Sequence, residues 1–476
     1  MQKDLMPNAF FMLVLTIVLV LLYPLLHNRI PLLSSNFKSY SFFDSYLLKD
    51  STLLDTTMCF DTPFEAELDV PKYNGSVFLN PFFKKLQNKN SQTRIAYYGD
   101  SVIEGDLLSQ TVRDSLQKRF GGRGVGFVPI TSKIPGFRRT IHHHFSGNWS
   151  SFNMLKSPPE GLIIGYLGET FFCKNTLSGT QDSLGNATIL LDTMRIDSIL
   201  LDTVKLEEKP LVHDVRYIAS RRFAGISTLA NAKLYYASTD SVTQVGTLKV
   251  KIAGKQNIHL LDGKKAVNET QLNSGYTGKI NLEFADICSH LLYGISFESP
   301  TGVILDNIPS RGNSGAGLMR LRPDVMNEFQ AYLGLDLVVL NFGLNVLNAK
   351  MTDYSWYATE MTRVVRNMEK GFPGVSILIL GPADHAIKLE GKMQTDPSIE
   401  RITSVLRAVA EKNETAFFSF YEAMGGRGSM IKWVEQSEPK LANSDYTHFN
   451  FKGAEKAGKL LLTYLMEAFE VWESEI

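Results

Sequence analysis

The sequence predicts an α/β protein with a parallel sheet between two layers of helices and a β-rich domain inserted into it. Apolar runs rich in Val, Ile and Leu are typical of parallel strands buried on both faces, and helical stretches separate them. Strands are expected at 93–99, 302–308, 336–343, 375–381 and 415–421, and helices near 318–332, 354–370, 398–411 and 452–471. A long block after the first strand lacks convincing helices, and its short β-rich runs predict a sandwich.

The first element is an uncharged stretch from Ala9 to Leu26, preceded by Lys3. Its length is near the minimum for a helix that crosses a bilayer, and no small-residue cleavage site follows it. We therefore expect residues 1–30 to be an uncleaved signal anchor and transmembrane helix, with the body of the chain outside the cytoplasm. A cleaved signal peptide is the main alternative, because N-terminal placement suits both.

Residues 31–90 have no strong periodicity, and we interpret them as a stalk and a lead-in. Residues 91–154 are expected to form the first part of the α/β domain, because the first strand leads into an amphipathic helix. The apolar stripe of that helix consists of Leu108, Val112, Leu116 and Phe120.

Residues 155–300 are the expected insertion, because the α/β rhythm precedes them and returns in residues 301–476. Gly, Asn, Asp and Ser separate the short runs at intervals typical of a β-sandwich. Its aromatic side chains are expected in the core and not on a sugar-stacking surface; they are Tyr235, Tyr236, Tyr293 and Phe297.

The composition excludes several classes of function. The chain of 476 residues has 49 Lys plus Arg and 49 Asp plus Glu, so its overall charge gives no reason to expect a nucleic-acid partner. Three widely spaced cysteines, Cys59, Cys173 and Cys288, predict neither a disulfide framework nor a zinc site.

The histidines give no reason to expect a metal or a cofactor. Those of the run His142–His144 are consecutive, so they cannot all face one ion, and no cluster at ligand spacing accompanies them. We expect a solvated loop or a cleft rim there, and a surface position for His385.

Polar residues and glycines follow the expected strands at their carboxyl ends, where open parallel sheets place their functional sites. These ends carry Gly99-Asp100-Ser101, the turn Gly312 to Gly317, Gly343 with Asn345, and Asp445 with His448. Each short motif is weak by itself, because serines and aspartates often cap helices and glycines serve turns.

Taken together, these residues predict nucleophilic catalysis. A serine nucleophile needs a base, an acid that orients the base, and N–H donors for the oxyanion. In this interpretation Ser101, His448 and Asp445 supply the first three groups. The backbone N–H groups of Ser101 and Gly312 and the side-chain amide of Asn345 supply the donors, and other glycines of the 312–317 turn fit the same role.

The order of these motifs resembles blocks I, II, III and V of the SGNH (GDSL-type) hydrolases, over residues 93–150 and 300–470. The resemblance implies a flavodoxin-like three-layer α/β/α fold. It also implies that Ser101 is the nucleophile, that Asp445 and His448 complete the triad, and that Ser101, Gly312 and Asn345 line the oxyanion hole.

The longer first block, GDSVIEGDLLSQTVRDSLQKRFGGRGVGFVPI, is similar to that of membrane-associated or periplasmic peptidoglycan O-acetylesterases. Those enzymes also carry an inserted β-sandwich, a jelly roll related to carbohydrate-binding modules. Two positions depart from their pattern. Val102 stands where those enzymes usually have histidine. Val346 stands directly after the G-x-N motif, where they often have a polar or acidic residue. Both departures bear on the identity of the substrate more than on the assignment of the triad.

The resemblance implies a serine esterase that deacetylates an O-acetylated envelope polysaccharide, such as peptidoglycan, through an acyl-serine intermediate. One alternative is a membrane-anchored O-acyltransferase that works beside an integral-membrane partner, and another is a non-catalytic glycan-binding protein. The expected partners are the acetylated glycan and the membrane. The expected location is a bacterial inner membrane facing the periplasm, or the periplasm itself if the N-terminal segment is cleaved.

Overall fold

The computed structural model describes residues 73–174, 213–238 and 245–476. The expected signal anchor at residues 1–30, most of the expected stalk and Cys59 lie outside the described residues. Within the described ranges, no helix has both the length and the apolar character needed to cross a membrane.

A five-stranded parallel sheet forms the centre of the α/β region, in the order β13-β1-β14-β15-β18. All of its neighbouring strands run parallel. The strands are β1 (Gln92–Gly99), β13 (Gly302–Pro309), β14 (Leu335–Asn341), β15 (Ser376–Gly381) and β18 (Ala416–Ser419). The apolar runs of the sequence form these strands, so the prediction of a buried parallel sheet is confirmed.

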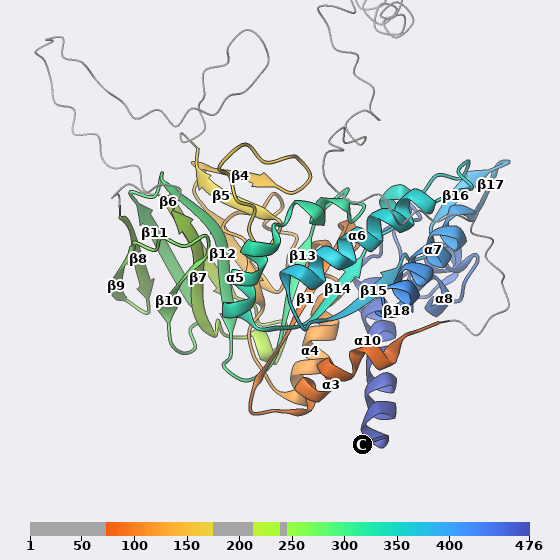
Figure 1. Ribbon diagram of the computed structural model, residues 1–476, viewed down its shortest axis with the longest axis horizontal. Helices are drawn as coiled ribbons and strands as arrows, with labels where there is room; N and C mark the ends of the chain where they lie inside the picture. Colours follow the sequence, from red (N-terminus) through yellow and green to blue (C-terminus); the bar gives the residue numbers. More distant parts are fainter. Residues whose placement is uncertain (1–72, 175–212, 239–244) are drawn as a thin grey trace, which may run out of the picture. The chain divides into compact units, whose positions relative to one another are not determined.

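Helices cover both faces of this sheet, which makes three layers (Figure 1). One face packs against α3 (Asn80–Gln87), α4 (Ser109–Phe120) and α10 (Phe451–Ser474). The other packs against α5 (Pro323–Leu333), α6 (Ser355–Gly371) and α7 (Ser398–Lys412). The remaining short elements are η1 (Ser76–Leu79), η2 (Ser101–Asp106), η3 (Ala224–Ile226), η4 (Ala316–Arg320), η5 (Leu344–Val346), β16 (Ala386–Leu389), β17 (Lys392–Thr395), α8 (Phe420–Ala423), α9 (Ser429–Ile431) and η6 (Lys432–Gln436).

The lead-in before the first strand ends in a packed helix. Helix α3 buries Phe82 and Phe83 in the core below the sheet, and the Phe83 ring meets that of Phe469 from α10 at 5.7 Å between centroids. The sequence pattern does not predict this helix, because α3 is short and Lys84 and Lys85 follow its two phenylalanines directly.

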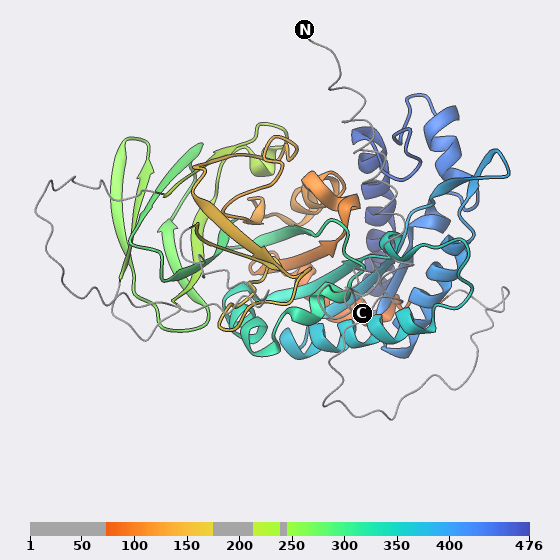
Figure 2. The same cartoon turned by 90° about the horizontal axis from the view of Figure 1, so that it is seen from above.

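Two antiparallel sheets form the β-rich region, which lies at the β13 edge of the parallel sheet (Figures 1 and 2). The first has the order β10-β7-β12-β5-β4, with β2 paired to β12, and the second has the order β3-β6-β11-β8-β9. Their bounds are β2 (Gly126–Val128), β3 (Ile141–Phe145), β4 (Trp149–Asn153), β5 (Glu169–Cys173), β6 (His213–Ala219), β7 (Asn231–Ser238), β8 (Gly246–Ile252), β9 (Lys255–Leu261), β10 (Asn268–Asn273), β11 (Lys279–Ala285) and β12 (His290–Glu298). The four aromatic side chains expected in the core of this region are all buried, as predicted.

The antiparallel strands begin earlier in the chain than residue 155, where the sequence pattern places the start of the insertion. Strands β2, β3 and β4 all precede that residue. These strands are short, and β3 exposes His142 and His144 while it buries His143, so no continuous apolar run marks them.

A buried ion cluster joins the parallel sheet to the antiparallel region. Arg94 of β1 donates to Asp306 of β13 at 2.8 Å and pairs with Glu298 of β12. Asp306 also accepts from the Tyr166 hydroxyl and the Phe127 N–H, each at 2.7 Å. Arg94 therefore links β1 and β13 of the parallel sheet to β12 of the antiparallel region through ion pairs.

Candidate active site

The turn after β1 carries Ser101 at the carboxyl end of that strand. Asp100 caps the turn, because its side chain accepts from the Val102 N–H at 2.9 Å. The first strand does not lead directly into the predicted amphipathic helix: η2 comes first, and α4 begins only at Ser109. Gly105 and Asp106 both have positive φ values, of 70° and 63°, so the chain changes direction between the two helical segments.

The structure brings Ser101, His448 and Asp445 into one hydrogen-bonded chain. The Ser101 Oγ lies 3.0 Å from His448 Nε2, and His448 Nδ1 lies 2.8 Å from Asp445 Oδ2. The other Asp445 oxygen accepts the backbone N–H groups of Thr447 and His448, each at 3.0 Å. These bonds fix the acid and the imidazole in a loop just before α10.

The charge of Asp445 is held in place by its hydrogen bonds. Partial burial would raise the pKa of Asp445, but the bonds from His448 and Thr447 outweigh it and lower the pKa. An ionised Asp445 accepts a hydrogen bond from His448 Nδ1–H, and in that tautomer His448 Nε2 has a lone pair that can accept a hydrogen bond from the Ser101 hydroxyl. The side chains of His448 and Asp445 are 41% and 49% exposed, so water reaches this pair.

The three predicted oxyanion donors differ in how their hydrogens are used. The Asn345 amide nitrogen donates to Asp100 Oδ2 at 3.1 Å and to the Asn313 carbonyl at 3.0 Å. Among the described residues, no hydrogen bond uses the backbone N–H of Ser101 or of Gly312. The N–H groups of Gly315 and Gly317 both donate to Asn313 Oδ1. Gly312 is therefore the glycine of this turn whose N–H lacks an acceptor.

Asp100 is a functional candidate that the sequence pattern leaves without a role beyond capping. It is only 2% exposed, although its neighbour Ser101 is half-buried. Burial raises the pKa of Asp100 to about 6, against the opposing effects of the Val102 N–H, the His448 charge and the Asn345 amide. The sequence signal for this residue is the acid next to the serine, which a cap explains equally well.

Asp106 anchors the far end of the serine turn. Its fully buried carboxylate accepts from Arg113 of α4 at 2.6 and 2.9 Å and from the Thr140 hydroxyl at 2.6 Å. Arg138 lies 3.4 Å from the same carboxylate. Burial would raise the pKa of Asp106, but the charges of Arg113 and Arg138 lower it. This cluster ties the turn that holds Ser101 to α4 and to the start of the antiparallel region.

The remaining histidines lie outside the hydrogen-bonded chain of Ser101. His143 stacks on Tyr217 with ring centroids 4.6 Å apart, and burial lowers its pKa to about 4. His385 is half-buried beside Asp396, at 3.5 Å, so it is not a fully exposed surface residue. Burial lowers the pKa of His385 more than Asp396 raises it.

Comparison with known proteins identifies the fold. No family model matches the chain, and no curated protein matches it either. A solved structure of a peptidoglycan O-acetylesterase matches with a TM-score of 0.61 and 23% identity, over 84% of this chain and 99% of that chain. The chain therefore has the fold of that structure, and the predicted α/β class, with a parallel sheet and additional antiparallel sheets, is confirmed.

Other solved structures match less well. An acetyl xylan esterase has a TM-score of 0.25 and 15% identity, over 34% of this chain and 81% of that chain. A family two carbohydrate esterase from Cellvibrio japonicus has a TM-score of 0.25 and 10% identity, over 55% of this chain and 92% of that chain.

Proposed function

We propose that this chain is a serine esterase that removes acetyl groups from an O-acetylated polysaccharide of the cell envelope. One observation carries the proposal: Ser101, His448 and Asp445 form a continuous hydrogen-bonded chain at the carboxyl end of β1. A hydroxyl that donates to an imidazole, itself oriented by a carboxylate, is the arrangement that activates a serine nucleophile.

The reaction follows from this geometry. Ser101 Oγ attacks the ester carbonyl while His448 Nε2 accepts its proton, and the carbonyl oxygen becomes an oxyanion near the N–H groups of Ser101 and Gly312. His448 then protonates the departing sugar hydroxyl, which leaves an acetyl-serine. A water molecule, deprotonated by His448, attacks that ester and releases acetate, and the proton returns to Ser101.

Hydrolysis is favoured over transfer by the exposure of the site. His448 and Asp445 are 41% and 49% exposed, so solvent has access to the acetyl-serine. An acyltransferase needs a site that excludes water until the acceptor hydroxyl is bound. We therefore propose a hydrolase, with acetyl transfer to a glycan as the competing outcome of the test.

The proposed substrate class draws on two kinds of support. The first block of the sequence is similar to that of peptidoglycan O-acetylesterases, and the chain shares the fold of one such enzyme at a TM-score of 0.61. An envelope location, with residues 1–30 as an anchor or a cleaved signal, fits this substrate and is part of the proposal.

The proposal is tested with the full chain and its Ser101→Ala variant. We expect the parent to release acetate from p-nitrophenyl acetate, acetylated peptidoglycan and acetylated xylan, and the variant to be slower by at least about 10³-fold. A fluorophosphonate probe should label the parent at Ser101. Equal rates in the two proteins would contradict the esterase, and recovery of the acetyl group on a glycan acceptor would favour transfer.

A further inference from the structure

The two cysteines of the described residues lie on neighbouring parts of one antiparallel sheet. Cys173 is the last residue of β5, and Cys288 lies in the turn that leads into β12 at His290. Strands β5 and β12 run antiparallel, with Leu292 opposite Phe171. The same register places Cys173 opposite His290, so the turn with Cys288 comes directly beyond the end of β5.

The two thiols are in contact. Those of Cys173 and Cys288 are hydrogen-bonded to each other, and neither sulfur is in a disulfide. Cys173 is buried, whereas Cys288 is exposed. Burial raises the pKa of the Cys173 thiol above its usual range, and its bond with Cys288 raises it further. The buried sulfur is therefore kept uncharged, and a disulfide is a second uncharged state open to it.

Strand β5 is joined to the rest of its sheet by a short pairing. Strand β12 pairs with β7 along its whole length, from His290 to Glu298, whereas its pairing with β5 is centred on Leu292 and Phe171. On its other side β5 pairs with β4, which is the last strand in the order of this sheet. The β4–β5 pair therefore depends on few backbone bonds, and a covalent bond at the end of β5 would add to them where they are fewest.

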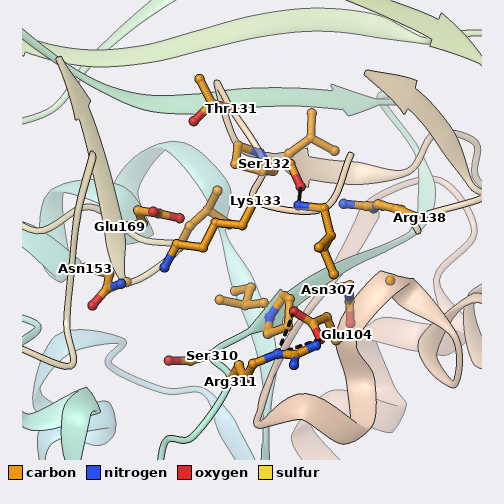
Figure 3. Close-up of a pocket in the computed structure, with 18 of the residues that line it drawn as sticks. Glu104, Thr131, Ser132, Lys133, Arg138, Asn153, Glu169, Asn307, Ser310 and Arg311 are labelled. Atoms are coloured by element: carbon orange, nitrogen blue, oxygen red, sulfur yellow. Dashed lines mark hydrogen bonds and ion pairs between the residues drawn. The ribbon is translucent and has the colours of Figure 1, made fainter. Parts of the chain in front are cut away.

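The other end of β5 forms part of a cavity of about 180 Å³ beside the serine turn (Figure 3). Glu169 of β5 and Asn153 of β4 line it, together with Glu104 of η2 and with Arg311 from the segment after β13. Because β5 runs from Glu169 to Cys173, a bond that fixes one end of the strand also holds this wall of the cavity.

We propose that Cys173 and Cys288 form an intrachain disulfide when the folded chain meets a small-molecule disulfide such as oxidised glutathione. The bond joins the end of β5 to the turn before β12 and closes a loop that contains β6 to β11. Cross-linking a long loop stabilises a fold mainly by restricting the unfolded chain. Disulfides persist in oxidising compartments such as the bacterial periplasm, which fits the envelope location proposed above. The proposal concerns two thiols and does not rest on the esterase activity.

The reaction proceeds in two exchange steps. The exposed Cys288, as a thiolate, attacks one sulfur of oxidised glutathione, so the S–S bond of that molecule breaks and one glutathione thiolate leaves. Cys173 then gives up its proton and attacks the Cys288 sulfur, which expels the second glutathione thiolate. The two cysteines lose two electrons, oxidised glutathione gains them, and the two protons from the cysteines go to the two glutathione thiolates.

Oxidation of the full chain tests the proposal. The parent, Cys288→Ser and Cys59→Ser are equilibrated with reduced and oxidised glutathione, quenched with acid and blocked with iodoacetamide. Tryptic peptides, analysed by mass spectrometry without reduction, then show which cysteines are linked. Cys59→Ser is the matched control, because it leaves the pair intact and removes the third cysteine of the chain. Unfolding midpoints and amide hydrogen exchange in β5 report on the effect of the bond.

The parent and Cys59→Ser should yield a peptide that links Cys173 to Cys288. Oxidation should raise the unfolding midpoint of both proteins by about 3–8 °C and slow amide exchange in β5. Cys288→Ser should form no link, and its midpoint, close to that of the reduced parent, should not change on oxidation.

The absence of a link between Cys173 and Cys288 in the folded parent, at the most oxidising ratio, would overturn the proposal. So would a link from either residue to Cys59, or glutathione that remains bound to Cys288. A linked pair with an unchanged midpoint and unchanged exchange would show that the bond does not fasten β5, and would overturn that part of the proposal.

Discussion

Asn345 already has hydrogen-bond partners in the resting site, and it is also a predicted donor to the oxyanion. Its amide nitrogen already donates to Asp100 and to the Asn313 carbonyl. To donate to an oxyanion it has to share or exchange one of these bonds, because an NH₂ group has two hydrogens. Its contribution is therefore made in the transition state and not in the resting site.

The first prediction concerns that contribution. Asn345→Ala should lower kcat on p-nitrophenyl acetate by about 10²–10³-fold, the usual loss for one oxyanion donor. The residue is exposed, so the unfolding midpoint should stay close to that of the parent. A parent-like kcat would show that the Ser101 and Gly312 N–H groups suffice.

The second prediction concerns the buried carboxyl beside the nucleophile. The folded chain holds the pKa of Asp100 near 6, mainly through burial, whereas an unfolded aspartate has a pKa near 3.8. The folded state therefore binds the proton more tightly, so stability falls as pH rises from about 4 to 6 and stays lower above that range. A shift of about two units corresponds to about 3 kcal/mol.

Asp100→Asn should remove this penalty. At pH 7.5 the variant should be more stable than the parent by up to about 3 kcal/mol, and the difference should shrink toward pH 4. Denaturant unfolding of both proteins at pH 4.5 and pH 7.5 measures it. A difference that does not depend on pH would mean that the Asp100 carboxyl titrates as it does in water.

At the scale of elements, the serine turn depends on a buried carboxylate for its shape. Asp106 links η2 to α4 through Arg113 and to the start of the antiparallel region through Thr140. Removing one charge from a buried ion cluster leaves the others uncompensated, which costs about 3–5 kcal/mol.

Asp106→Asn is therefore predicted to destabilise the fold by about 3–5 kcal/mol, measured by denaturant unfolding. Asp262→Asn is the matched control, because Asp262 is exposed and has no ion pair among the described residues. If the two substitutions had equal small effects, the cluster around Asp106 would not hold the turn.

The elements also differ in how well the sequence predicts them. The strands of the parallel sheet follow from apolar runs, because burial on both faces demands such runs. The sequence pattern does not predict helix α3 and strand β3, because their contacts come from distant segments: Phe83 packs on Phe469, and β3 pairs with β6. A bend at the end of η2 also separates Ser101 from α4, since the positive φ values of Gly105 and Asp106 interrupt the helix.

At the scale of the described molecule, one arginine joins the two kinds of sheet. Arg94 is fully buried and contacts Asp306 of β13 and Glu298 of β12. Burial would raise the pKa of Glu298, but Arg94 and Lys233 lower it to about 2, so the cluster is charged at neutral pH. The parallel sheet and the antiparallel region are therefore coupled through a charge network that neither can satisfy alone.

The fourth prediction follows from this coupling. The two regions should unfold in a single calorimetric transition, and Arg94→Met should lower the stability of that whole transition by about 3–5 kcal/mol. Arg221→Met, at an exposed arginine, should change it by less than about 0.5 kcal/mol. Two separate transitions, of which Arg94→Met moves only one, would contradict the coupling.

The sequence by itself determined the α/β class, the parallel strands and the polar residues at their ends, because burial period and turn chemistry are local properties of the chain. Only the tertiary structure decided which of those residues meet. The Ser101 hydroxyl and the His448 imidazole are 347 positions apart in the chain and 3.0 Å apart in space. The burial of Asp100, the cluster on Asp106 and the cavity beside the serine turn were decided in the same way, since each depends on side chains that packing brings together from distant segments.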